Sequence, residues 1–160
     1  MPIVRAYAMY HFGLPVNDLE IAKDFYVNVL GFNVAPERER TAGAPRPAQV
    51  RLYCGDKHVP GLDLILFERP KPIERDSRAT QEAALRGYEE GTAHDSSLLL
   101  QDGSYHNAYV VSPEDLDEAL VRFKEVGIVV AAVPRTGSRN RSIYLFDPDG
   151  NKIQLSDRPA

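Results

Sequence analysis

A chain of 160 residues with 43% hydrophobic side chains has enough apolar material for the core of one domain. The net charge of −4 and the lack of a basic stripe exclude a typical nucleic-acid binder, and no apolar run is long enough to cross a bilayer. Cys54 is the only cysteine, which excludes an internal disulfide, and the N-terminal residues lack a secretory signal pattern. We therefore expect a cytoplasmic protein that does not interact with membranes.

The first part of the chain predicts one strand, one helix and three further strands. The largely apolar residues 9–16 predict a strand, and Asn17 and Asp18 follow as helix N-caps. Apolar side chains then recur at helical spacing as far as Leu30, and Gly31 provides the left-handed C-cap. Three more strands are predicted over residues 32–35, 49–54 and 62–68.

A long connection follows. Its stiff start at Arg69–Pro72 leads into a predicted helix over residues 78–90, capped by Asp76 or Ser77 and ended by Gly91. Residues 95–103 predict either an extra strand or an irregular arm. Connections of this length commonly cover a cleft or contact a second subunit.

The last part of the chain repeats the order of the first. A strand is predicted over 105–112, and Ser112 caps a helix that has Pro113 at its first position and ends at Gly127. Strands over 128–133, 142–146 and 152–155 follow, the last two joined by a turn at Asp147–Asn151. Each half is therefore predicted as β-α-β-β-β.

The two halves carry histidines at matching positions. His11 stands before Asp18-Leu19 and Gly31, and His106 stands before Asp115-Leu116 and Gly127 at nearly the same spacing. A supersecondary unit used twice can bring equivalent residues together across a pseudo-twofold axis. Two histidines related in this way are well suited to share a metal ion.

The chain resembles the vicinal oxygen chelate superfamily, which includes glyoxalase I, type I extradiol dioxygenases and bleomycin-binding proteins. The resemblance is carried by His11–Val16, Ala22–Tyr26 with Leu30–Phe32, and Tyr144–Leu155. It implies an α+β fold in which two tandem βαβββ units form a cupped mixed sheet with helices on its outer face. We expect one domain over 1–160, with units at 7–69 and 104–157 and an arm at 70–103.

The resemblance also implies a metal site for one divalent ion, namely iron, manganese, zinc or nickel. The family positions match His11 and His106 in the two first strands and Gln154 in the last strand, where glutamate is usual. Asp63 is the only polar residue within 62–67 and is the candidate for the fourth ligand. Glu68 is a competing candidate, and an exposed edge position would also explain Asp63.

Tyr144 resembles the active-site tyrosine of extradiol dioxygenases and is a candidate catalytic hydrogen-bond donor to a bound oxygen anion, although packing alone also explains it. The histidine and glutamate that accompany that tyrosine are missing here, since residues 133–141 contain no histidine. His58 and His94 are expected to be solvated, and acid-base work close to the site is the alternative for each. Arg135, Arg139 and Arg141 are expected in a solvated loop.

The leading functional hypothesis is a metal-dependent enzyme whose small substrate chelates the ion through vicinal oxygens. Lyase, isomerase and ring-cleaving dioxygenase chemistry all fit this arrangement. The alternative is a metal-free protein that binds a small molecule or an antibiotic, as bleomycin resistance proteins do. A regulatory domain has no positive feature in its favour. The resemblance implies a homodimer in either case.

Overall fold

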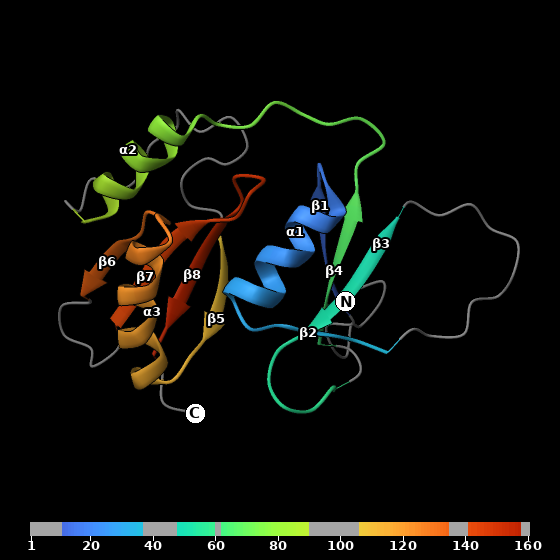
Figure 1. The fold of residues 1–160 in the computed structure, drawn as a ribbon, viewed down its shortest axis with the longest axis horizontal. Helices are drawn as coiled ribbons and strands as arrows, with labels where there is room; N and C mark the ends of the chain where they lie inside the picture. The colour runs from blue at the N-terminus through green and yellow to red at the C-terminus, as the bar shows by residue number, and fades with distance from the viewer. Residues whose placement is uncertain (1–10, 37–47, 60–61, 90–105, 135–140, 158–160) are drawn as a thin grey trace, which may run out of the picture. The chain divides into compact units, whose positions relative to one another are not determined.

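The computed structural model describes residues 11–36, 48–59, 62–89, 106–134 and 141–157 (Figure 1). The chain divides into two compact units, Met1–Ile73 and Glu74–Ala160. The helix of the connecting segment groups with the second unit. The predicted N-terminal strand residues 9 and 10, and the predicted extra strand at 95–103, lie outside the described residues. No described helix has the length and apolar character needed to cross a membrane.

The first unit is a four-stranded sheet with one helical segment. Its elements are β1 (His11–Val16), α1 (Leu19–Asp24), the π-helix η1 (Phe25–Val29), β2 (Asn33–Val34), β3 (Gln49–Tyr53) and β4 (Asp63–Glu68). The strand order is β1-β4-β3-β2. β1 runs parallel to β4, whereas the other neighbours are antiparallel. This mixed sheet agrees with the predicted order of elements.

The first helix is not one continuous α-helix as its spacing predicts. Asp18 caps it by accepting a 2.9 Å hydrogen bond from the Ile21 amide, but from Phe25 the chain widens into η1, and the Leu30 amide donates to the Phe25 carbonyl. The buried rings of Phe25 and Tyr26 pack edge to face with centroids 5.6 Å apart. Tertiary packing of these rings accounts for the departure from the simple 3.6-residue period.

The second unit repeats the arrangement of the first. Its elements are α2 (Arg78–Glu89), β5 (Asn107–Val110), α3 (Pro113–Glu125), β6 (Ala131–Pro134), β7 (Arg141–Phe146) and β8 (Lys152–Ser156). The strand order β5-β8-β7-β6, with β5 parallel to β8, is the same as in the first unit. The predicted repeat of β-α-β-β-β units is therefore confirmed.

The ends of the two helical segments also match. Gly31 and Gly127 have φ values of 73° and 72°, so both predicted left-handed caps are present. Strand β6 begins later than the predicted residue 128. The Ile128 amide donates a 2.8 Å hydrogen bond to the Phe123 carbonyl, which keeps Ile128 in the turn that ends α3.

Helix α2 packs on one face of the second sheet (Figure 1). Its Ala84 and Leu85 are 3% and 2% exposed and form a cluster with Ala131, Tyr144 and Phe146. Side chains alternate along β7, so its buried Ile143 and Leu145 lie on the opposite face. Both faces of β7 are therefore covered.

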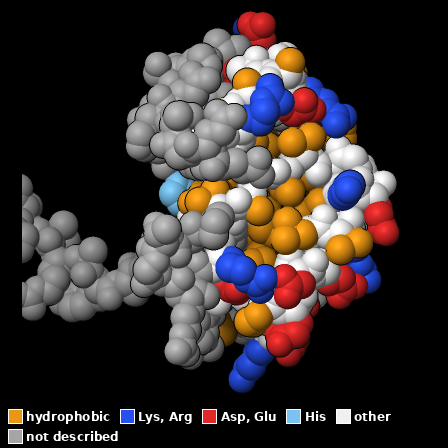
Figure 2. Space-filling view, turned by 90° about the vertical axis from the view of Figure 1, so that its left-hand side faces the viewer, with side chains coloured by type: hydrophobic (Ala, Val, Ile, Leu, Met, Phe, Trp, Pro, Cys, Tyr) orange, Lys and Arg blue, Asp and Glu red, His pale blue; other side chains and the backbone are white. Residues whose placement is uncertain are grey.

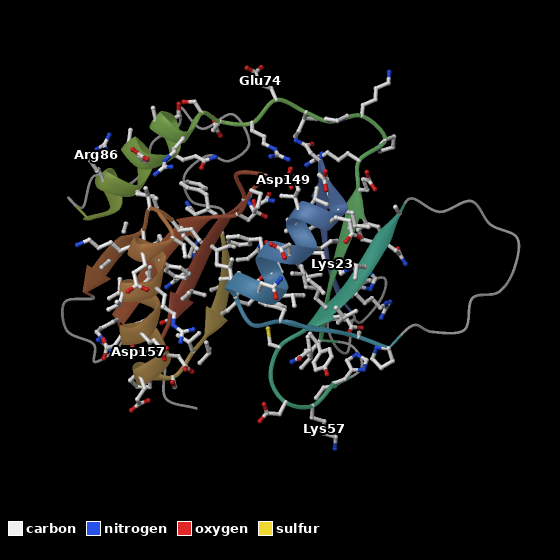
Figure 3. All side chains as sticks on the ribbon, viewed as in Figure 1. Lys23, Lys57, Glu74, Arg86, Asp149 and Asp157 are labelled. Carbon is white, nitrogen blue, oxygen red and sulfur yellow. The ribbon has the colours of Figure 1, made fainter. Side chains whose placement is uncertain are left out.

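Arg141 joins three elements at the start of β7, where the sequence predicted a solvated loop. Its backbone amide and Nε donate to the two carboxylate oxygens of Asp157 at 2.5 and 2.8 Å, and its Nη1 donates to Asp117 of α3. These hydrogen bonds from the Arg141 side chain and amide lower the pKa of Asp157 (labelled in Figure 3). Arg135 and Arg139 lie outside the described residues.

Candidate functional site

The first sheet has a polar face that begins at His11. The exposed His11 opens β1 and is the register partner of Asp63 on β4, so both side chains lie on the same face of the sheet. The other face of these strands carries Leu14, Val16, Leu64 and Leu66, all of which are buried. Most of the buried apolar side chains of these two strands thus lie on one side, and His11 and Asp63 lie on the other, together with the buried Ile65.

Asp63 is fully enclosed, and each of its carboxylate oxygens has a partner. Oδ2 accepts a hydrogen bond from Arg51 Nη1 at 2.5 Å, and Oδ1 lies 2.7 Å from His58 Nε2. The Asp63 side chain is 0% exposed, against 19% for Arg51 and 22% for His58. The ion pair supplies the partner that a buried carboxylate requires. An exposed edge position for Asp63 is therefore wrong.

His58 is not the solvated turn residue that its sequence context suggests. It comes from the loop between β3 and β4 that also carries Lys57 (labelled in Figure 3). Besides its contact with Asp63, its ring lies 5.0 Å from the ring of Tyr53. The polar face of the first sheet thus gains Arg51 and His58, which the sequence analysis did not place there.

The competing candidate Glu68 lies on the other face. It is five residues after Asp63 on β4 and is the register partner of Val16. The two-residue period of a strand directs side chains at odd separations to opposite sides of the sheet. Glu68 is therefore not on the face that carries His11.

The second sheet has an equivalent face whose charged member is the fully buried Lys152, two residues before Gln154 on β8. The exposed His106 directly precedes β5, and Ala108 two residues later is the register partner of Gln154 on β8. Gln154 is 3% exposed, and its Nε2 donates a 2.8 Å hydrogen bond to Ser142 Oγ. This contact fixes the amide through its nitrogen end, and no hydrogen bond to its carbonyl oxygen is recorded among the described residues.

Tyr144 lies on the same face as Gln154, its register partner on β8. Its ring meets the ring of His106 edge to face, with centroids 5.8 Å apart, and it belongs to the cluster beneath α2. At 9% exposure it is nearly buried. Packing is therefore part of its role, and this packing orients the His106 ring.

Two groups of predicted residues are thus assembled, one in each unit: His11 with Asp63, and His106 with Gln154 and Tyr144. Within the described ranges, no three His, Cys, Asp or Glu side chains form a metal-binding group. The predicted set includes an amide and draws on both units, so the four-ligand site stays a prediction. His94 lies outside the described residues.

A separate shallow groove of about 360 Å³ lies between the start of α2 and the end of α3. Its lining comprises Arg78, Leu120, Lys124 and residues 127–130. Figure 2 shows hydrophobic side chains gathered on this side of the second unit, with charged side chains around them. None of the predicted site residues lines this groove.

Comparisons with known proteins agree with this fold. The family model of the Glyoxalase/Bleomycin resistance protein/Dioxygenase superfamily matches residues 8–155. The catechol-2,3-dioxygenase of Bacillus subtilis (strain 168) is 30% identical over 148 residues, which are 91% of this chain. This chain spans only 40% of that enzyme's length.

Solved structures show the same fold at lower identity. A glyoxalase/dioxygenase from Nostoc punctiforme has a TM-score of 0.66 and 22% identity, with 100% of this chain and 99% of that chain covered. A variant of the fosfomycin resistance protein FosX from Listeria monocytogenes was solved with Mn(II) and 1S,2S-dihydroxypropylphosphonic acid. It has a TM-score of 0.60 and 19% identity, with 94% and 92% covered. The chain belongs to the glyoxalase/bleomycin resistance protein/dioxygenase superfamily.

Proposed function

We propose that the chain is a metal-dependent enzyme that acts on a small substrate chelating one divalent ion through vicinal oxygens. The observation that carries this proposal is the equivalent position of two exposed histidines. His11 opens the strand parallel to β4, and His106 directly precedes the strand parallel to β8, in two sheets of the same strand order. A histidine that served only to fill the core would be buried. It would also have no reason to recur at the same position in both units.

The donor chemistry of these residues fits a divalent transition metal. Neutral imidazole nitrogens suit iron, manganese, zinc and nickel, and the Gln154 carbonyl adds a neutral oxygen. Its amide nitrogen is held by Ser142, which leaves the oxygen end for coordination. The proposed ligands are His11, His106 and Gln154. Asp63, the fourth ligand that the resemblance predicts, is left out of this proposed set because both of its oxygens already have partners.

The surrounding side chains orient these ligands. The Tyr144 ring packs against His106 and limits the rotation of the imidazole, and we assign the Tyr144 hydroxyl as a donor to an anionic substrate oxygen. A bound ion would act as a Lewis acid that polarises two adjacent substrate oxygens. Isomerisation, lyase chemistry and ring cleavage of a catechol all begin from such a complex.

The relatives support this class of activity without naming the substrate. The catechol-2,3-dioxygenase relative makes catechol the first substrate to test, and the manganese in the FosX structure makes manganese an ion to test. A cytoplasmic homodimer with a small-molecule substrate is part of the same proposal.

Elemental analysis of protein purified without chelators or an affinity tag tests the proposal. We expect about one iron, manganese, zinc or nickel ion per chain, together with turnover of catechol if the ion is redox-active. A folded protein that stays empty when each ion is supplied would contradict the proposal and favour the metal-free binding protein.

A further inference from the structure

The fourth predicted ligand is adjacent to a proposed metal ligand. Asp63 is the register partner of His11 on the neighbouring parallel strand, and neighbouring strands lie about 4.8 Å apart. An ion bound to His11 would therefore have a carboxylate as its near neighbour. Carboxylate oxygens are strong ligands for divalent ions, so the question is what occupies those oxygens.

Both oxygens of Asp63 are occupied by donors from outside β1 and β4. Arg51 reaches Oδ2 from β3, where it is the register partner of Ile65, two residues beyond Asp63 on the same face. His58 reaches Oδ1 from the loop before β4. Arginine keeps its charge at all accessible pH values, so the Asp63 carboxylate is neutralised by a permanent cation.

We infer that Arg51 and His58 hold Asp63 back from metal coordination, so that a coordination position stays open for substrate. The inference rests on the proposed function, because it concerns the ion that His11 would bind. Coordination by Asp63 would require the ion to displace Arg51, and the freed guanidinium would then lie close to a divalent cation. That repulsion, together with the loss of the buried ion pair, opposes recruitment of Asp63.

The inference differs in its consequences from a purely structural ion pair. If the pair only stabilises the fold, replacing Arg51 lowers stability and leaves metal affinity unchanged. If Arg51 withholds Asp63, the Arg51→Met variant gains a ligand and binds metal more tightly. Metal affinity therefore separates the two roles.

The test is a titration of chelator-treated, full-length protein with Mn²⁺ and with Zn²⁺ by calorimetry. We expect Arg51→Met to bind about tenfold more tightly than the unmodified chain, a change typical of groups that tune metal ligands. The double variant Arg51→Met/Asp63→Asn removes both charges of the pair, so it should lose the gain and bind metal as the unmodified chain does. Arg51→Gln, which keeps a neutral donor for Oδ2, serves if Arg51→Met does not fold.

Two results would overturn the inference. One is a folded Arg51 variant with unchanged or weaker affinity, and the other is a large loss of affinity in the charge-balanced double variant relative to the unmodified chain, which would make Asp63 a resident ligand. Failure of the proposed function looks different, because the unmodified chain then binds neither ion. In that case, the inference is still supported if the Arg51 variant gains metal binding and the double variant loses it again. An Arg51 variant that also binds no metal refutes the inference.

Discussion

The two sheets carry histidines at equivalent positions but surround them with different chemistry. Next to His11 lies a buried carboxylate that is ion-paired with Arg51 and in contact with His58. On the His106 face, the neighbours are the amide of Gln154, the hydroxyl of Ser142, the ring of Tyr144 and the buried side chain of Lys152. The topology of the two units is the same, whereas a buried carboxylate lies beside the first histidine, and an amide, a hydroxyl and a buried lysine lie on the face of the second.

The difference shows which part of a duplicated unit is free to diverge. Strand order, glycine caps and the two histidines follow from the repeat, and the side chains around each histidine do not. The second face has a further distinction, since α2 packs on it through Ala84 and Leu85. The variants below alter one side of this comparison at a time.

The largest effect is expected from Leu85→Ala, which uncovers the second face and leaves the first untouched. Leu85 is 2% exposed, and truncation of a buried leucine costs about 2–5 kcal/mol of unfolding free energy. Hydrogen exchange should show a larger loss of protection in β7 than in β4. The control Leu66→Ala, in the core of the first unit, should give the larger loss in β4; the same pattern in both variants would contradict the assignment of Leu85 to the second unit and Leu66 to the first.

Gln154→Glu makes the second face resemble the first by adding a carboxylate. No arginine contacts Gln154 in the described part of the chain, so a metal ion competes for the new charge only with the buried Lys152, two residues earlier on the same face of β8. We expect Mn²⁺ affinity to rise about tenfold, or about 1.4 kcal/mol, as measured by calorimetry. Gln154→Met, which removes the oxygen donor, should lower it; unchanged affinity in both variants would exclude residue 154 from the ligand set.

Asp157 provides a pH-dependent test of the second unit alone. Its pKa is lowered in the folded chain by hydrogen bonds from Arg141, so its stabilisation is complete above the unfolded-state pKa of about 4. The stabilisation is lost as the pH falls through the lower folded-state value. Asp157→Asn should therefore lower the melting temperature at pH 7, and the difference from the unmodified chain should shrink below about pH 4. A pH-independent difference would contradict this assignment.

The smallest effect is expected from Ser142→Ala. The variant removes the acceptor for the Gln154 amide, and loss of one such buried hydrogen bond costs about 1 kcal/mol in denaturant unfolding. Metal affinity should fall slightly because Gln154 is less well oriented. A neutral effect on both measurements would show that Ser142 does not position Gln154.

The order of elements could be predicted because it depends on local patterns. Gly31 and Gly127 end helical segments at positive φ, and Ser112 caps α3 by accepting from the Asp115 amide, as their sequence context indicates. The π-helix at Phe25–Val29 could not be predicted, since it depends on how buried aromatic rings pack. Periodicity alone carries no information on that packing.

The site was only partly predictable for the same reason. The isolated Asp63 in an apolar strand signals a need for a partner, but its partners come from β3 and from a loop. Which residue reaches it depends on strand register, which the sequence alone left open. The same limit applies to Arg141, whose partner Asp117 lies on α3 and whose partner Asp157 directly follows β8.

The central claim is that His11 and His106 bind the same ion, and a matched pair of variants tests it most directly. Chelator-treated protein carrying His11→Ala or His106→Ala is titrated with Mn²⁺ and Zn²⁺ beside the unmodified chain, with circular dichroism as the check on folding. We predict that each substitution alone abolishes stoichiometric binding while the fold remains. Retention of stoichiometric metal by both folded variants would contradict the account.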